Sequence, residues 1–229
     1  MKTTMPPRIL SLLVLGSLSL LAGKASASML FNIDFGSNNA APSPAFGASA
    51  LQPGVWNQMI GAPLALVDVS GAATGVVISV PVADSFGGFG GSLAGDLGLL
   101  MSDNFFSSPG TPWSMTVSGL ANGNYDFYYY APTHPSVDTG AFTINGISAG
   151  NLTGSTTGSR TVEGLDWEKV ANVPVTSGTL TTTWINAVPA QFTGLSGIQI
   201  VPTPEPGSLA LLVLAGASLG LRRKRTVSV

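Results

Sequence analysis

Residues that could carry acid–base or nucleophilic chemistry are few and scattered along the chain. His134 is the only histidine and there is no cysteine, and a lone histidine in a loop is more often a surface residue than a catalytic base. Asp166 and Glu168 alternate, so on a strand both carboxyl groups would reach one face. Glycosidases use such a pair across a cleft, but solvated acids are the simpler interpretation. The sequence therefore predicts no enzyme, with a glycan-active hydrolase or lyase as the least favoured alternative.

Aromatic residues with polar neighbours are better represented, and this combination suits carbohydrate. Sugars have apolar C–H faces and polar edges, so their sites commonly join an exposed ring to Asn, Asp and backbone groups. The candidates are Trp56, Asn57, Asp126, Tyr128, Tyr130, His134, Asp138 and Trp167. The loop 132–140 is preferred, because it brings His134 and Asp138 next to the Tyr128 and Tyr130 face. For each aromatic the alternative is burial, where Trp and Tyr are usually found.

A glycine-rich stretch, 86–95, lies between Asp84 and Asp96 and is a weak candidate for a Ca²⁺ loop. It lacks the alternating Asp/Asn ladder of an EF-hand, and a flexible turn is the default interpretation. Apart from this structural Ca²⁺ candidate, no cofactor is predicted.

Short runs of β-branched and aromatic residues recur between Gly, Pro, Asn and Ser, which is typical of strands separated by turns. The predicted strands are 30–35, 64–69, 75–82, 113–117, 125–131, 140–144, 170–175, 180–186 and 195–201. No stretch has the apolar stripe and charged face of a surface helix, and 86–92 is expected to be a low-complexity loop. The pattern predicts an all-β fold, a β-sandwich of the jelly-roll type.

The segment 118–130 orients the predicted aromatic site. Turn residues in 118–124 feed directly into a strand, whose successive side chains face opposite ways. Tyr125, Phe127 and Tyr129 should therefore share one face, and Asp126, Tyr128 and Tyr130 the other.

Several fragments together resemble the galactose-binding-like sandwiches of bacterial secreted proteins, a group that includes malectin-like and carbohydrate-binding modules. They are Asn32-Ile-Asp-Phe-Gly36, Gly54-Val-Trp-Asn57, Asp68-Val-Ser-Gly71 followed by Thr74-Gly-Val76, Ser118 to Tyr130, and Gly194 to Val201. The resemblance implies a β-sandwich that binds carbohydrate.

The N-terminus has the order of a secretory signal peptide. Lys2 and Arg8 precede an apolar run, 9–22, and Ala25-Ser26-Ala27 supplies the small residues that signal peptidase requires. The predicted divisions are a signal peptide at 1–27, a β-sandwich ectodomain at 28–201 and a terminal segment at 202–229.

The terminal segment joins a proline-rich motif, an apolar run and a basic cluster. Pro204, Glu205 and Pro206 precede the run 209–221, and Arg222, Arg223, Lys224 and Arg225 follow it. The segment from Gly207 to Leu221, about fifteen residues, makes a helix of ~22 Å, short of a ~30 Å hydrocarbon core. The cations favour a cytoplasmic C-terminus. A buried terminal helix is the alternative.

This order resembles the PEP-CTERM sorting signal of Gram-negative bacteria that make extracellular polysaccharide. The resemblance implies export through the inner membrane, processing by an exosortase, and release to the cell surface or the extracellular matrix.

The net charge of the middle region, 28–201, limits the kinds of partner that it can bind. Between 28 and 201 only Arg160 and Lys169 are basic, against ten carboxylates, a net charge of −8. Nucleic acid is therefore a poor partner, and a neutral extracellular polysaccharide is favoured. A purely structural biofilm or surface protein with no ligand site is the main alternative.

The signal-peptide assignment predicts that the exported protein begins at Ser28. N-terminal sequencing of protein recovered from the cell envelope measures this directly. An intact Met1 in that fraction would contradict the assignment.

Overall fold

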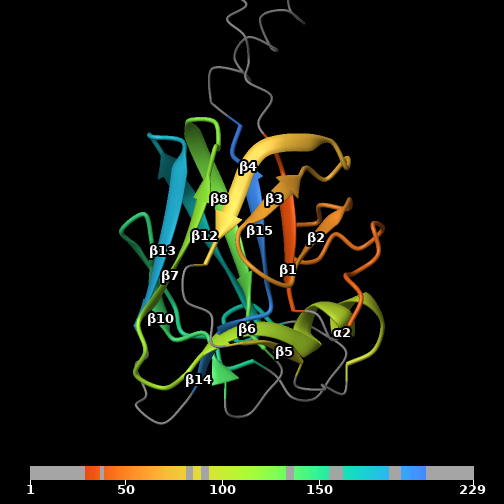
Figure 1. Cartoon of the computed structure of the whole chain (residues 1–229), viewed down its shortest axis with the longest axis vertical. Coiled ribbons are helices and arrows are strands. Elements are labelled where there is room, and N and C mark those ends of the chain that lie inside the picture. Colours follow the sequence, from red (N-terminus) through yellow and green to blue (C-terminus); the bar gives the residue numbers. More distant parts are fainter. Residues whose placement is uncertain are drawn as a thin grey trace, which may run out of the picture.

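The computed structural model describes residues 29–36, 39–80, 85–88, 93–132, 137–154, 162–185 and 192–204, and they form three β-sheets and one helix. Figure 1 shows two tall sheets side by side, with the third sheet and the helix at the lower end. The predicted all-β fold is confirmed.

A five-stranded sheet forms one layer of the sandwich. From edge to edge its strands are β12 (Trp167–Val175), β8 (Gly123–Tyr130), β15 (Gly197–Pro202), β1 (Phe31–Phe35) and β2 (Trp56–Met59). All neighbours are antiparallel except β1 and β2, which are parallel. The first and last of the described strands, β1 and β15, are therefore direct neighbours.

A six-stranded antiparallel sheet forms the second layer. Its order is β11 (Ile147–Ala149), β10 (Ala141–Ile144), β13 (Thr179–Ile185), β7 (Trp113–Ser118), β4 (Ala73–Ser79) and β3 (Leu64–Val67). Alternate residues of these strands point at the five-stranded sheet, as the two-residue period of a strand requires.

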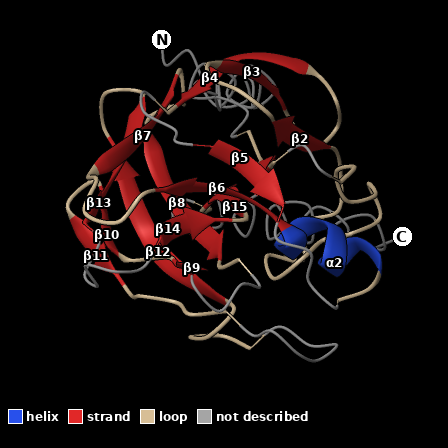
Figure 2. Cartoon of the chain, turned by 60° about the horizontal axis from the view of Figure 1, so that its bottom comes forward, coloured by secondary structure: helices blue, strands red, loops and turns tan. Residues whose placement is uncertain are grey.

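The third sheet closes the lower end, as the turned view in Figure 2 makes plain. Its order is β5 (Ser85–Gly88), β6 (Asp103–Ser107), β14 (Phe192–Leu195) and β9 (Val137–Asp138). The helix α2 (Gly95–Ser102) leads directly into β6.

The main core lies between the two tall sheets. Tyr125, Phe127 and Tyr129 of β8 all point into it, so the face predicted for these three residues is confirmed. From the opposite sheet, Trp113 and Trp184 contribute indole rings that stack with centroids 3.6 Å apart. The strand alternation thus places large aromatic surfaces at the centre of the sandwich, where burial contributes most to stability.

All nine predicted strand regions contain a strand, but the prediction missed several elements. The missed ones are β2, β5, β6, β9, β11, β14 and α2. The expected loop at 86–92 is wrong in part, because Ser85–Gly88 pairs with β6. The helix escaped notice because its sequence, GDLGLLMS, has two glycines and no charged face.

Within the described ranges no helix is long and apolar enough to span a membrane. The predicted anchor helix at 209–221 lies outside them, as do the signal peptide and the basic cluster.

Candidate functional site

The site is built on the outer face of the five-stranded sheet, which points away from the main core. Strand register aligns two rows of side chains across this face. One row contains Trp56, Asn32, Gln199, Tyr128 and Lys169, and the next contains Gln58, Asp34, Gly197, Tyr130 and Trp167. Three of the predicted sugar-binding aromatics are therefore spread over neighbouring strands of one surface, together with Trp56 at its far edge.

The part of this face around β1, β2 and β15 is covered by the segment 39–55 and α2. The cover forms a second apolar cluster in which Trp56, Leu100, Met101 and Tyr130 are buried. Tyr128 and Trp167 pack at its border and are only partly buried. The cover therefore decides which of the aromatics are open to solvent.

Buried hydrogen bonds attach the cover to the sheet. The Tyr130 hydroxyl donates to Gln199 Oε1 at 2.5 Å and accepts from the Ser49 amide at 2.8 Å. Gln199 Nε2 donates to Asn32 Oδ1 at 2.8 Å and to the Gly47 carbonyl at 3.1 Å. Burial raises the pKa of Tyr130 well above its usual range, so the hydroxyl stays neutral and can donate.

Trp56 and Asn57 are also structural. Trp56 is buried, its Nε1 donates to the Phe46 carbonyl at 3.0 Å, and its ring stacks on Phe46. Asn57 donates to the Asn32 and Val67 carbonyls and accepts from the Val67 amide. Asn57 thereby joins β1 of one sheet to β3 of the other.

Tyr128 and Trp167 form the exposed part of the aromatic face. Their rings lie nearly parallel, with planes 27° apart and centroids 6.0 Å apart. Both side chains are only partly buried, so part of each remains accessible to solvent. The turn before Trp167 adds exposed apolar surface from Val162 and Leu165.

Charged groups border these two rings. Lys169 Nζ lies 6.0 Å from the centroid of the Tyr128 ring and 3.4 Å from Asp126 Oδ2. Burial raises the pKa of Tyr128, the Lys169 charge lowers it, and the nearby carboxylates of Asp126 and Glu163 raise it. The tyrosine therefore stays a neutral hydroxyl that can both donate and accept.

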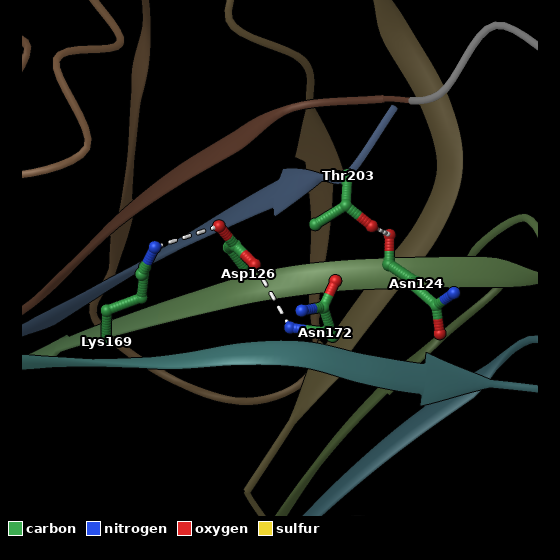
Figure 3. Close-up of polar contacts among 5 residues, drawn as sticks. All are labelled: Asn124, Asp126, Lys169, Asn172 and Thr203. Carbon is green, nitrogen blue, oxygen red and sulfur yellow. Dashed lines mark hydrogen bonds and ion pairs between the residues drawn. The ribbon is translucent and has the colours of Figure 1, made fainter. Parts of the chain in front are cut away.

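Asp126 fixes this arrangement through a β-bulge in β12, and Figure 3 shows its contacts with Lys169 and Asn172. The register shifts between Val170 and Val173, so two residues of β12 oppose one of β8. Asn172 takes a positive φ of 56° there, and its amide donates to Asp126 Oδ1 at 3.0 Å. One carboxylate thus holds both the bulge and the Lys169 ammonium.

The remaining predicted residues lie elsewhere. Asp138 is buried and accepts from the Gly140 amide and from Asn151 Nδ2, which holds the chain after β9. His134 lies outside the described residues, as does Asp84. Of the eight predicted residues, the structure brings Asp126, Tyr128 and Trp167 together at an accessible surface.

The acid pair Asp166 and Glu168 and the Ca²⁺ candidate Asp96 all accept hydrogen bonds from within the protein. Asp166 is buried and accepts from the Val162 amide at 2.7 Å, whereas Glu168 Oε2 accepts from the Tyr129 hydroxyl at 2.6 Å. Asp96 lies in the first turn of α2, where it accepts from the Ser43 amide and hydroxyl, each at 2.7 Å. Among the described residues, no three His, Cys, Asp or Glu side chains gather as in a metal site.

Sequence reasoning missed Lys169 and Asn172 as parts of the site. Lys169 follows Trp167 by two residues, so strand alternation alone would have put both on one face. The role of Asn172 depends on the bulge, which no local sequence pattern indicates.

A shallow, open hollow of about 360 Å³ lies at the other end of β8 and β12. It is lined by Asn122, Gly123, Asn124, Pro174, Val175 and Thr176. None of the predicted sugar-binding residues lines it.

No protein-family model matches the sequence, and no curated protein matches it. Solved structures with partial likeness include the ectodomain of ANX2 from Arabidopsis thaliana, at 10% identity over 78% of this chain and 50% of that one, TM-score 0.42. The plant receptor-like kinase FER matches at 15% identity over 77% of this chain and 42% of that one, TM-score 0.38.

The CBM32-3 module from a family 31 glycoside hydrolase of Clostridium perfringens matches at 9% identity over 55% of this chain and 91% of that one, TM-score 0.33. The chain thus spans half or less of the two plant proteins. TM-scores of this size carry no argument about function, and the sandwich architecture rests on the strand pairing of the chain itself.

The network under the cover predicts that Tyr130→Phe destabilises the protein. Loss of the hydroxyl leaves the Ser49 amide without its acceptor and removes one of the two hydrogen bonds to Gln199 Oε1, which costs about 1–3 kcal/mol of unfolding free energy. Urea unfolding followed by tryptophan fluorescence measures the loss. Tyr128→Phe is the matched control and should stay close to wild type, since its ring is partly exposed. Equal stabilities for the two variants would contradict the network.

Proposed function

We propose that the protein binds neutral carbohydrate on the outer face of its five-stranded sheet. The observation that carries the proposal is the partly exposed, nearly parallel pair Tyr128 and Trp167, bordered by Lys169 and Asp126. The rings offer an apolar platform for the C–H face of a sugar. The ammonium and carboxylate offer a donor and acceptors for hydroxyl groups at its edge.

Charge favours a neutral ligand. Lys169 already pairs with Asp126, and the Glu163 carboxylate is close enough to act on Tyr128. The region 28–201 carries a net charge of −8. An anionic polymer would meet repulsion at long range and no unpaired cation from the described residues at the site.

The same geometry favours binding over hydrolysis. A glycosidase needs an acid and a base on opposite sides of the scissile bond. At this surface Asp126 holds the bulge and Lys169, while Asp166 is buried and Glu168 binds Tyr129. We therefore assign the protein a binding function and not catalysis.

We further propose that this domain is exported as an exosortase substrate with a jelly-roll, galactose-binding-like fold. The order of signals at the two termini of the sequence supports export. The strand register suits a tethered domain, because Phe31 of β1 pairs with Ile200 of β15, and Thr203 donates to the Asn124 carbonyl. The beginning of β1 and the end of β15 therefore lie at the same end of the domain, as Figure 1 shows.

Carbohydrate binding is tested with the purified protein on an array of neutral and acidic polysaccharides. We expect a neutral glycan to bind, and Tyr128→Ala and Trp167→Ala each to weaken it about tenfold or more, because an aromatic anchor contributes on the order of 1–2 kcal/mol. Phe192→Ala removes an exposed aromatic of the third sheet and is the matched control.

Thermal melts would verify that these variants remain folded. Binding to no glycan would favour a purely structural surface protein. Release of reducing sugar would favour a hydrolase.

The sorting proposal predicts separate roles for the Pro-Glu-Pro motif and the terminal cations. In a host with an exosortase, replacing Pro204, Glu205 and Pro206 should leave the protein membrane-bound and unprocessed. Neutral residues at 222–225 should instead disturb its retention and orientation. Mass spectrometry of each cell fraction measures both effects, with Ser208→Ala as control. A Pro-Glu-Pro variant that matures like wild type would refute processing at this motif.

A further inference from the structure

Asp34 is a carboxylate without a partner in the interior of the protein. It is the fourth residue of β1, on the outer face of the five-stranded sheet, and lies under α2 and the cover. Its exposed fraction is 0%, and neither Oδ1 nor Oδ2 has a hydrogen-bond partner in the part of the chain that the structure describes. A buried, unpaired carboxylate is costly unless it is neutralised or binds a cation.

A second buried carboxylate lies beside it. Asp103 follows α2, and a Cβ added to Gly36 would lie 2.3 Å from Asp103 Cβ, so the Asp103 side chain lies against the end of β1. Asp103 is held there by Asn39, whose amide and Nδ2 each donate to it at 2.7 Å. These two bonds fix its position and leave each oxygen with a free lone pair.

The surroundings of the two acids are negative. The helix α2 ends at Ser102 with no basic residue in its last turn, and its terminal carbonyls add partial negative charge. Lys169, the one lysine or arginine among the described residues, is paired with Asp126. Burial and the Asp103 carboxylate raise the pKa of Asp34 to about 8.

We propose that Asp34 and Asp103 bind a Ca²⁺ ion. The two carboxylates and the adjacent amide and carbonyl groups offer oxygen ligands only, the set that Ca²⁺ prefers, whereas Zn²⁺ favours nitrogen and sulfur. Gln58 is in register with Asp34, and its Nε2 donates to the Asn39 carbonyl. In this proposal its Oε1 supplies a further oxygen ligand.

Two carboxylates meet here and not three, so carbonyl and amide oxygens would complete the coordination. Sites with few charged ligands bind weakly, in the range of about 10⁻⁴–10⁻³ M that suits extracellular modules. The ion would join the end of β1 to the α2–β6 junction, at the opposite end of the sandwich from Thr203. It would stabilise the end of the domain that is remote from the proposed tether.

The proposal is tested by melting the full-length protein after chelation and again with Ca²⁺ or Mg²⁺ up to about 10 mM. We expect Ca²⁺ to raise Tm by roughly 3–10 °C, as mass action on a site of this affinity requires, and Mg²⁺ to raise it less. Calorimetric titration should give one Ca²⁺ per chain.

Asp34→Asn removes the unpaired charge at constant shape, so it should fold and lose the response to Ca²⁺. Asp96→Asn is the matched control, since both oxygens of Asp96 are engaged by Ser43, and it should respond like wild type. Absence of a Ca²⁺ response in the wild-type protein overturns the proposal. So does a response that survives Asp34→Asn or that disappears in Asp96→Asn, which would place the ion in the glycine-rich stretch.

Discussion

The hydrogen bonds of the Gln199 side-chain amide are the interactions on which the candidate site depends. This side chain is fully buried, lies at the centre of the outer face, and bonds to Tyr130, Asn32 and the backbone of the segment 39–55. These bonds satisfy the proton of the buried Tyr130 hydroxyl, Asn32 Oδ1 and both polar atoms of the Gln199 amide, so the network stabilises the cover in one position. That position buries Trp56 and Tyr130 and leaves Tyr128 and Trp167 at the edge.

The sequence predicted the features that follow from the alternation of side chains along a strand. It predicted much less of the burial that results from long-range packing. The strand at 125–131 was placed with its correct faces because aromatic and polar residues alternate there. Tyr128 and Trp167 meet because their strands pair, but burial of Trp56 and Tyr130 depends on a cover that has no regular pattern. No local signal reports that a segment eighty residues upstream of Tyr130 will lie over it.

Buried polar residues account for the other features of the structure that the sequence did not predict. Asn32 and Asp34 lie in a fully buried strand, and β6 begins with Asp103 and Asn104, both also buried. Asp and Asn are depleted in strands and are mostly found on surfaces. The sequence alone therefore could not indicate that two aspartates would meet in the interior. They meet because β1 and the end of α2 pack together, a contact between residues almost seventy positions apart.

The strand β15 is both the last described strand and an inner one, hydrogen-bonded to β8 on one side and to β1 on the other. A pull on the chain beyond Pro202 therefore acts along a strand held on both sides. The hydrogen bonds of both ladders bear such a load together, in shear, whereas an edge strand can be peeled away one bond at a time. The hydrogen bonds from the Thr203 amide and hydroxyl to the Asn124 carbonyl continue this pairing past the end of the sheet. Under the proposed attachment, tension from the tether would enter a strand that is paired on both sides, so drag on a bound polymer would be resisted by two strand ladders together.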